Sequence, residues 1–224
     1  MKSENVNLRK IDRMAVLAFK NSLRLHEDAI ILFNKHRFPS AYTLSVLSLE
    51  ELGKYFSLED FIFHSRVDGR YSPQDEEKFI NLIYQHRYKQ NKFAYQIDYP
   101  GFLYFPGFAK RLIKEIYASK IEKSKQDSIY VGLYRKNNIK GKISTPLSRI
   151  TEQKAEKQIT NLNDFILCFV LGFLKGLYNV DIPDLEKILT NNLILRLEEQ
   201  WPLQSASAAK IYKKIKDYTD AKED

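Results

Sequence analysis

The segment SVLSLEELGKYF, residues 45–56, places an acid pair and a lysine among large apolar residues. Glu50 and Lys54 are spaced i and i+4, and Glu51 and Lys54 i and i+3, so the three side chains share one side of a helix. An exposed ion pair of this kind is an ordinary surface feature that contributes about 0.3 to 0.5 kcal/mol. The surrounding leucines leave little room for a wide polar face, however. At least one carboxylate is therefore expected at the edge of the core, where it needs a partner.

A second polar group lies in the next predicted helix. His86 follows apolar residues at helical spacing and precedes Gln90 by one turn, so it is expected to point inward. One interpretation is a core histidine with an internal hydrogen-bond partner. The other is a reactive imidazole that, with Arg87 and Lys89, faces the acids of residues 45–56 across a crevice. Such a group could exchange a proton with an anionic substrate and stabilise its negative charge.

Other chemistries find less support in the sequence. The remaining histidines have no carboxylate or cysteine at metal-ligand spacing, so no structural zinc and no cofactor are expected; they are His26, His36 and His64. A mixed metal site of Glu50, Glu51 and His86 stays open as an alternative. The GKIS at 141–144 lacks the first glycine of a phosphate loop. Cys168 lies in the apolar run FILCFV and is interpreted as core filling.

Length and charge narrow the class of protein. The 224 residues suffice for one domain with its own core. A polar start, a single cysteine and an apolar run of only residues 165–174 predict a cytoplasmic protein without a membrane span. The net charge of +8 favours a polyanionic partner such as RNA. It could equally serve solubility, because the basic residues are spread along the whole chain.

The apolar spacing predicts an all-α protein, an antiparallel helical bundle. Residues 1–202 are expected to form one domain and residues 203–224 a charged tail helix. Helices are predicted at 7–36, 39–64, 72–97, 109–125, 151–178 and 181–202. Residues 129–134 are expected to be extended, within a small insertion or hairpin around 129–145, and the aromatic stretch 99–108 should pack onto the bundle.

Three motifs in order give the chain a resemblance to a known family. They are the EELGK helix, the HRYK stretch and the SKQDSIYVGLY segment at 124–134. Over about residues 10–180 the sequence resembles the AbiV-type abortive infection proteins, which are HEPN-like helical proteins of bacterial phage defence. The matching positions are Glu50, Glu51, Gly53 and Lys54, then His86 and Lys89, and then Lys125, Gln126, Tyr130 and Val131.

The resemblance implies a HEPN-like bundle that blocks phage propagation after sensing a phage product. Many HEPN relatives are dimeric, metal-independent endoribonucleases, so it further implies a homodimer, a phage-encoded activator and RNA as a partner. Those enzymes use an arginine followed a few residues later by a histidine. In this sequence no arginine precedes a histidine at that spacing, and His86 instead comes immediately before Arg87.

Two functions follow as hypotheses. In the first, His86 is the general acid or base of RNA cleavage, Arg87 and Lys89 stabilise the phosphate charge, and Glu51 fixes the histidine tautomer. Glu50, Lys54, Lys125 and Tyr130 would then be binding residues. In the second, the polar groups are structural, and the protein is a non-enzymatic binder that sequesters a phage or host factor or binds RNA.

Overall fold

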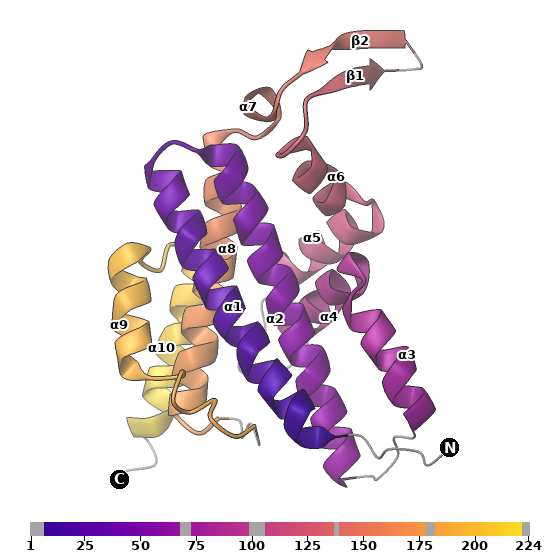
Figure 1. Cartoon of the computed structure of the whole chain (residues 1–224). Coiled ribbons are helices and arrows are strands. Elements are labelled where there is room, and N and C mark those ends of the chain that lie inside the picture. Colours follow the sequence, from indigo (N-terminus) through magenta and orange to yellow (C-terminus); the bar gives the residue numbers. More distant parts are fainter. Residues whose placement is uncertain (1–6, 68–72, 99–105, 137–138, 178–181, 221–224) are drawn as a thin grey trace.

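The computed structural model describes residues 7–67, 73–98, 106–136, 139–177 and 182–220. Within these ranges the chain is a bundle of α-helices with one small two-stranded sheet, so the all-α prediction is confirmed (Figure 1). The helices are α1 (Leu8–Asn34), α2 (Phe38–Val67), α3 (Pro73–Ile83), α4 (His86–Asp98), α5 (Pro106–Tyr117), α6 (Lys120–Asp127), α7 (Pro146–Arg149), α8 (Glu152–Leu174), α9 (Asn191–Gln200) and α10 (Ala206–Asp220).

The centre of the bundle is built by α1, α2 and α8. The first two lie antiparallel, as their short connection predicts, and α8 packs against both (Figure 1). Every side chain from Phe165 to Leu171 is at most 5% exposed, so this apolar run is a core segment. Within the described ranges, none of the helices combines the length and apolar character needed to cross a bilayer.

The prediction of one helix over residues 72–97 is wrong, because the chain breaks between α3 and α4. The N–H of Gln85 donates to the carbonyl of Leu82 in a tight turn, and α4 then starts at His86. Consequently His86 stands at a helix end instead of on a continuous apolar stripe. Its side chain is 53% exposed although Nδ1 faces Glu50 of α2, so the expectation that it points inward holds for one edge of the ring and not for the whole side chain.

Two further predicted helices are shorter or interrupted. Residues 109–125 divide into α5 and α6, because Ser119 adopts a left-handed backbone with φ of 53°. The predicted helix 181–202 begins only at Asn191 as α9, where the side chain of Thr190 caps the N–H of Leu193. Before it, residues 182–189 form turns that include a positive φ of 69° at Asp184.

The predicted hairpin is present. Strands β1 (Gly132–Lys136) and β2 (Ile139–Ser144) pair antiparallel, with Leu133 opposite Ile143. The hairpin extends beyond the end of the bundle next to α6 and α7 (Figure 1). Most of the aromatic stretch 99–108, which is predicted to pack onto the bundle, lies outside the described residues.

The C-terminal helix α10 packs against α8. Ala208, Tyr212 and Ile215 are buried in the same core. Asp164 of α8 accepts hydrogen bonds from the backbone N–H groups of Gln204 and Ser205, which fixes the start of α10. Residues of the predicted tail thus share the core of the bundle.

Candidate functional site

A glycine allows α2 and α4 to approach unusually closely. A Cβ atom on Gly53 would lie 1.9 Å from the carbonyl oxygen of Lys89, so no larger residue fits without moving a backbone. Glu50 precedes Gly53 by three residues and therefore lies on the same face of α2. The glycine of EELGK thus brings the Glu50 carboxylate to the first turns of α4.

Glu50 is the centre of a buried polar cluster. Its side chain is 1% exposed, and it collects donors from α4 and α6. Oε1 accepts hydrogen bonds from Gln90 Nε2 at 2.8 Å and Lys125 Nζ at 2.9 Å. Oε2 lies 2.6 Å from His86 Nδ1 and 3.8 Å from Lys89 Nζ. We call these five residues the Glu50 cluster. Its two ammonium groups supply the charge compensation that a buried carboxylate requires.

Lys125 is held in place by the end of α6. Ser128 Oγ donates to the carbonyl of Lys125 at 2.6 Å and also contacts Thr43 Oγ1 of α2 at 2.6 Å. Lys125 additionally pairs with Glu122 at 2.8 Å. Burial raises the pKa of Glu122, but hydrogen bonds from Lys125 and Gln126 outweigh that effect, so its pKa lies below the usual value. The Lys125 ammonium therefore bridges two carboxylates.

His86 is the exposed member of the Glu50 cluster. A carboxylate only accepts hydrogen bonds, so Nδ1 carries the proton directed at Glu50. In the neutral imidazole this leaves a lone pair on Nε2. With 53% of the side chain exposed, the ring is accessible to a ligand. A carboxylate that orients an imidazole in this way also stabilises the imidazolium formed when Nε2 takes up a proton.

Two cation–aromatic pairs include residues close to His86 in the sequence, Tyr84 and Arg87. The ammonium of Lys54 lies 5.3 Å from the ring centre of Tyr84, and the guanidinium of Arg87 lies 5.5 Å from that of Tyr117. Both rings are exposed, at 64% and 59% respectively. The residues next to His86 in the sequence thus carry positive charge and exposed aromatic surface.

The structure distributes the predicted residues differently from the sequence hypothesis. Glu50, not Glu51, contacts His86; Glu51 is partly buried, and among the described residues no hydrogen bond joins it to the imidazole. Lys89 was expected to face a substrate, but its side chain is 10% exposed and directed at Glu50. Tyr130 is 63% exposed and lies before the hairpin.

Sequence reasoning did not assign a role to Gln90, Tyr84 or Tyr117. Gln90 follows His86 by four residues on the apolar face of α4, and a polar residue at such a position signals a buried partner. The two tyrosines carry no comparable local signal. Their positions depend on the break before α4 and on the packing of α5 against α4.

The positions of the residues considered for other chemistries do not support a site. Cys168 is fully buried, and burial raises the pKa of its thiol far above the reactive range. Residues 141–144 belong to strand β2, so they form no phosphate loop. In the part of the chain that the structure describes, no group of three or more His, Cys, Asp or Glu side chains is arranged to hold a metal ion.

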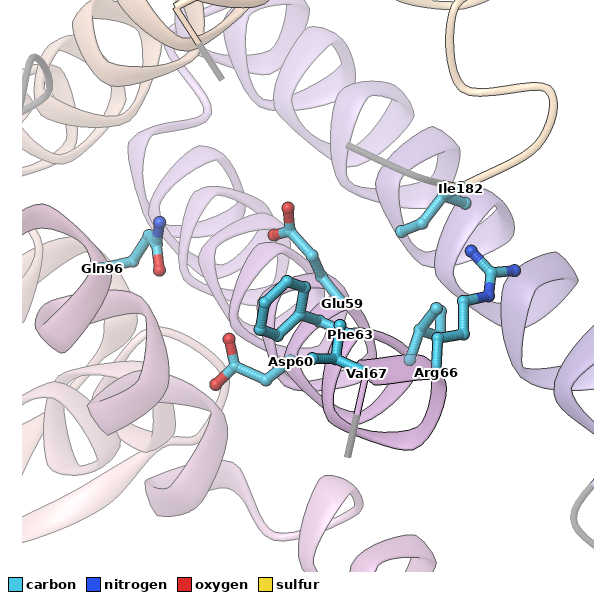
Figure 2. A pocket seen from close by; sticks show the side chains of 8 residues that line it. Glu59, Asp60, Phe63, Arg66, Val67, Gln96 and Ile182 are labelled. Carbon is cyan, nitrogen blue, oxygen red and sulfur yellow. The ribbon is translucent and has the colours of Figure 1, made fainter. Parts of the chain in front are cut away.

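A separate cleft of about 380 Å³ lies along the C-terminal half of α2 (Figure 2). In Figure 2 the carboxylates of Glu59 and Asp60 diverge on two sides of the Phe63 ring. Burial raises the pKa of Glu59 to about 7, although the charge of Lys92 opposes this shift. Glu59 follows Glu50 by nine residues, about 14 Å along the helix axis, so this cleft is distinct from the Glu50 cluster.

Most of the chain matches a known protein family. The family model HEPN_AbiV, described as AbiV, matches residues 10–166. This range contains α2, α4 and α6, and hence every member of the Glu50 cluster. No curated protein and no solved structure matches the chain.

Proposed function

Because the chain belongs to the AbiV family of HEPN proteins, whose role is abortive-infection defence against phage, we propose that it acts by cleaving RNA without a metal ion, with His86 as the catalytic base. The observation that carries this proposal is the 2.6 Å contact between His86 Nδ1 and a buried carboxylate. An imidazole used only for packing would be buried, whereas 53% of the His86 side chain is exposed.

The proposed reaction uses the ribose 2′-hydroxyl as nucleophile. Nε2 of His86 removes the 2′-hydroxyl proton while the 2′-oxygen forms a bond to the adjacent phosphorus. The bond from phosphorus to the 5′-oxygen breaks, and the leaving oxygen takes a proton from water. The products are a 2′,3′-cyclic phosphate and a 5′-hydroxyl, and His86 returns its proton to solvent.

The neighbouring residues have distinct roles in this reaction. Glu50 stabilises the imidazolium and fixes its orientation. Arg87, which is exposed beside His86, stabilises the negative charge that develops on the phosphate. Lys89 and Lys125 are positioning residues, since their ammonium groups compensate Glu50. We further propose that the active form is a homodimer and that a phage-encoded protein releases its activity.

The test is RNA sequencing with end mapping in phage-challenged cells carrying wild type or His86→Gln. His86→Gln should leave the folded protein level unchanged, because the side chain is half exposed, and should abolish both the new RNA ends and the protection. His64→Gln, an exposed histidine near the end of α2, is the matched control and should behave as wild type. Protection that persists in His86→Gln without new RNA ends would refute catalysis.

One observation favours the non-enzymatic alternative. Large apolar side chains are exposed on and beside the hairpin, namely Ile129, Tyr130, Val131, Leu133, Ile143 and Leu147. A surface of this kind is typical of protein interfaces. Under this alternative, Ile143→Asp abolishes protection while Leu195→Asp, at another exposed position on α9, does not, and neither variant changes cellular RNA.

A further inference from the structure

The cleft along the C-terminal half of α2 contains a carboxyl group that the fold does not use. Glu59 as a residue is only partly buried, but its carboxyl group is almost completely surrounded by protein. Among the described residues, no donor forms a hydrogen bond with it. The charge of Lys92 from α4 acts on it, but that ammonium pairs with Asp60. An enclosed acid without a donor costs free energy, so stability alone does not explain its presence.

The walls of the cleft supply apolar surface next to this acid. Phe63 and Val67 line the cleft and are 58% and 64% exposed. In Figure 2 the Glu59 carboxylate stands beside the Phe63 ring. Gln96 of α4 and Ile182, which precedes α9, complete the lining. The volume of about 380 Å³ lies within the range of small-molecule sites.

The charged groups around the cleft favour a positively charged ligand. Arg66 lines the cleft, but its guanidinium donates to both carboxylate oxygens of Asp12 from α1, at 3.0 and 2.9 Å. The Lys92 ammonium is paired with Asp60. Both cations thus already have a carboxylate partner, whereas Glu59 is an acceptor without a donor. An ammonium group supplies the two missing features, positive charge and N–H donors.

We propose that this cleft binds an amphipathic organic cation, a small molecule with one ammonium group on an apolar body. The ammonium donates to the Glu59 carboxylate, and the apolar body lies against Phe63 and Val67. Because the lining comes from α2, α4 and the segment before α9, the ligand contacts three parts of the bundle at once. The site is separate from the Glu50 cluster and does not depend on the proposed RNA cleavage.

Ionisation of Glu59 gives this binding a pH dependence. Burial raises the pKa of Glu59 to about 7, against the opposing charge of Lys92, so the carboxyl group is largely neutral at pH 5.5 and largely ionised at pH 8. The other charged groups at the cleft are paired, Lys92 with Asp60 and Arg66 with Asp12. Only the ionised form attracts an ammonium group. The affinity should therefore rise by about 10- to 30-fold from pH 5.5 to pH 8.

The experiment is a titration of the full chain followed by amide NMR. Three probes of similar size share a phenyl ring: 2-phenylethylamine is a cation, 2-phenylethanol is neutral and 3-phenylpropionate is an anion. At pH 8 the amine should bind with a dissociation constant on the order of 1 mM, the alcohol at least about 10-fold more weakly and the anion not detectably. Absence of amine binding, or equal affinity for amine and alcohol, would overturn the proposal.

Matched variants separate the charge from the apolar wall. Glu59→Gln keeps the shape of the cleft and should weaken amine binding by about 10-fold or more, the effect of losing one charge-assisted hydrogen bond, and should remove its pH dependence. Glu51→Gln, at another partly buried acid of α2, should bind as wild type does. Phe63→Ala should weaken binding by about 2- to 30-fold, whereas Leu195→Ala on α9 should not. Circular dichroism establishes that each variant is folded, and unchanged affinity in Glu59→Gln would contradict the assignment.

This proposal and the proposed RNA cleavage can fail independently. His86→Gln should bind the amine as wild type does, and loss of amine binding in that variant would place the ligand elsewhere. Glu59→Gln should still produce the His86-dependent RNA ends. If the amine binds through Glu59 while RNA stays intact under phage challenge, the cleft stands and catalysis fails.

Discussion

Replacing Glu50 by Gln should destabilise the protein strongly although the volume hardly changes. The carboxylate is 1% exposed and accepts hydrogen bonds from His86, Gln90 and Lys125, with the Lys89 ammonium 3.8 Å away. Without its charge, the nearly buried Lys89 ammonium loses the carboxylate beside it, and the Lys125 ammonium keeps only Glu122. Breaking such a buried pair lowers the free energy of unfolding by about 3 to 5 kcal/mol. Because the amide oxygen of Gln can still accept a hydrogen bond, we expect a loss at the low end of this range, about 3 kcal/mol. For a domain of this size, that lowers the melting temperature by about 6 to 12 °C.

The assay is urea unfolding followed by circular dichroism, with Glu51→Gln as the matched control. Glu51 is the adjacent acid but lies outside the Glu50 cluster, so its replacement should change the free energy of unfolding by about 0.5 kcal/mol or less. The double variant Glu50→Gln with Lys125→Met should lose less than the sum of the two single variants, because each removes the same interaction. If Glu50→Gln stays within about 1 kcal/mol of Glu51→Gln, the view of Glu50 as the charge centre is refuted.

Three other substitutions test the packing and the buried titratable groups. Gly53→Ala should cost about 2 kcal/mol in urea unfolding despite the better helix propensity of alanine, because the methyl group would overlap the backbone of Lys89; unchanged stability would contradict the close approach. Burial lowers the pKa of His26 from 6.5 to about 4, so the unfolded state binds its proton first, and stability should fall by about 3 kcal/mol from pH 7 to pH 4. His26→Gln, compared at both pH values, should remove that part of the loss. Burial instead raises the pKa of Glu59 to about 7, so the folded protein loses stability as pH rises through 7 and the buried carboxyl group ionises. Glu59→Gln should therefore be about 1 to 3 kcal/mol more stable than wild type at pH 8 but not at pH 4.5.

Helical periodicity sufficed for the long elements but not for the breaks that build the site. The helical spacing of Leu82 and Ile83 continues to His86 without a glycine or proline between them, so nothing local marks the end of α3. The turns at Ser119 and Asp184 likewise use left-handed backbone at residues other than glycine. Such conformations are stabilised by the surrounding fold, and sequence patterns report them poorly.

The contact between the EELGK and HRYK segments was predictable from the sequence. Which of the two acids, Glu50 or Glu51, makes the contact was not. Successive residues point about 100° apart around a helix, so both acids lie near the apolar boundary and only the partner helix decides between them. Gly53 held usable information, because a glycine inside a helix often marks a close helix contact. Its i−3 neighbour is Glu50, whereas Glu51 is two residues away and faces elsewhere.

The composition of the Glu50 cluster argues that it serves more than stability. Burying one carboxylate with two lysines is an inefficient way to stabilise a helical core, since apolar side chains of similar volume often do as well or better. Four of the five residues are shielded from solvent and hold the charge in place, while the fifth, His86, carries the network to the surface. A purely structural cluster would not need a member that is exposed at the surface. Replacing Glu50, Lys89 and Lys125 together by leucine should therefore yield a folded protein whose stability approaches that of wild type, yet one in which the imidazole of His86 has lost its orienting carboxylate. Under the proposed mechanism that protein no longer protects cells against phage, and full protection by it would mean that His86 acts without Glu50.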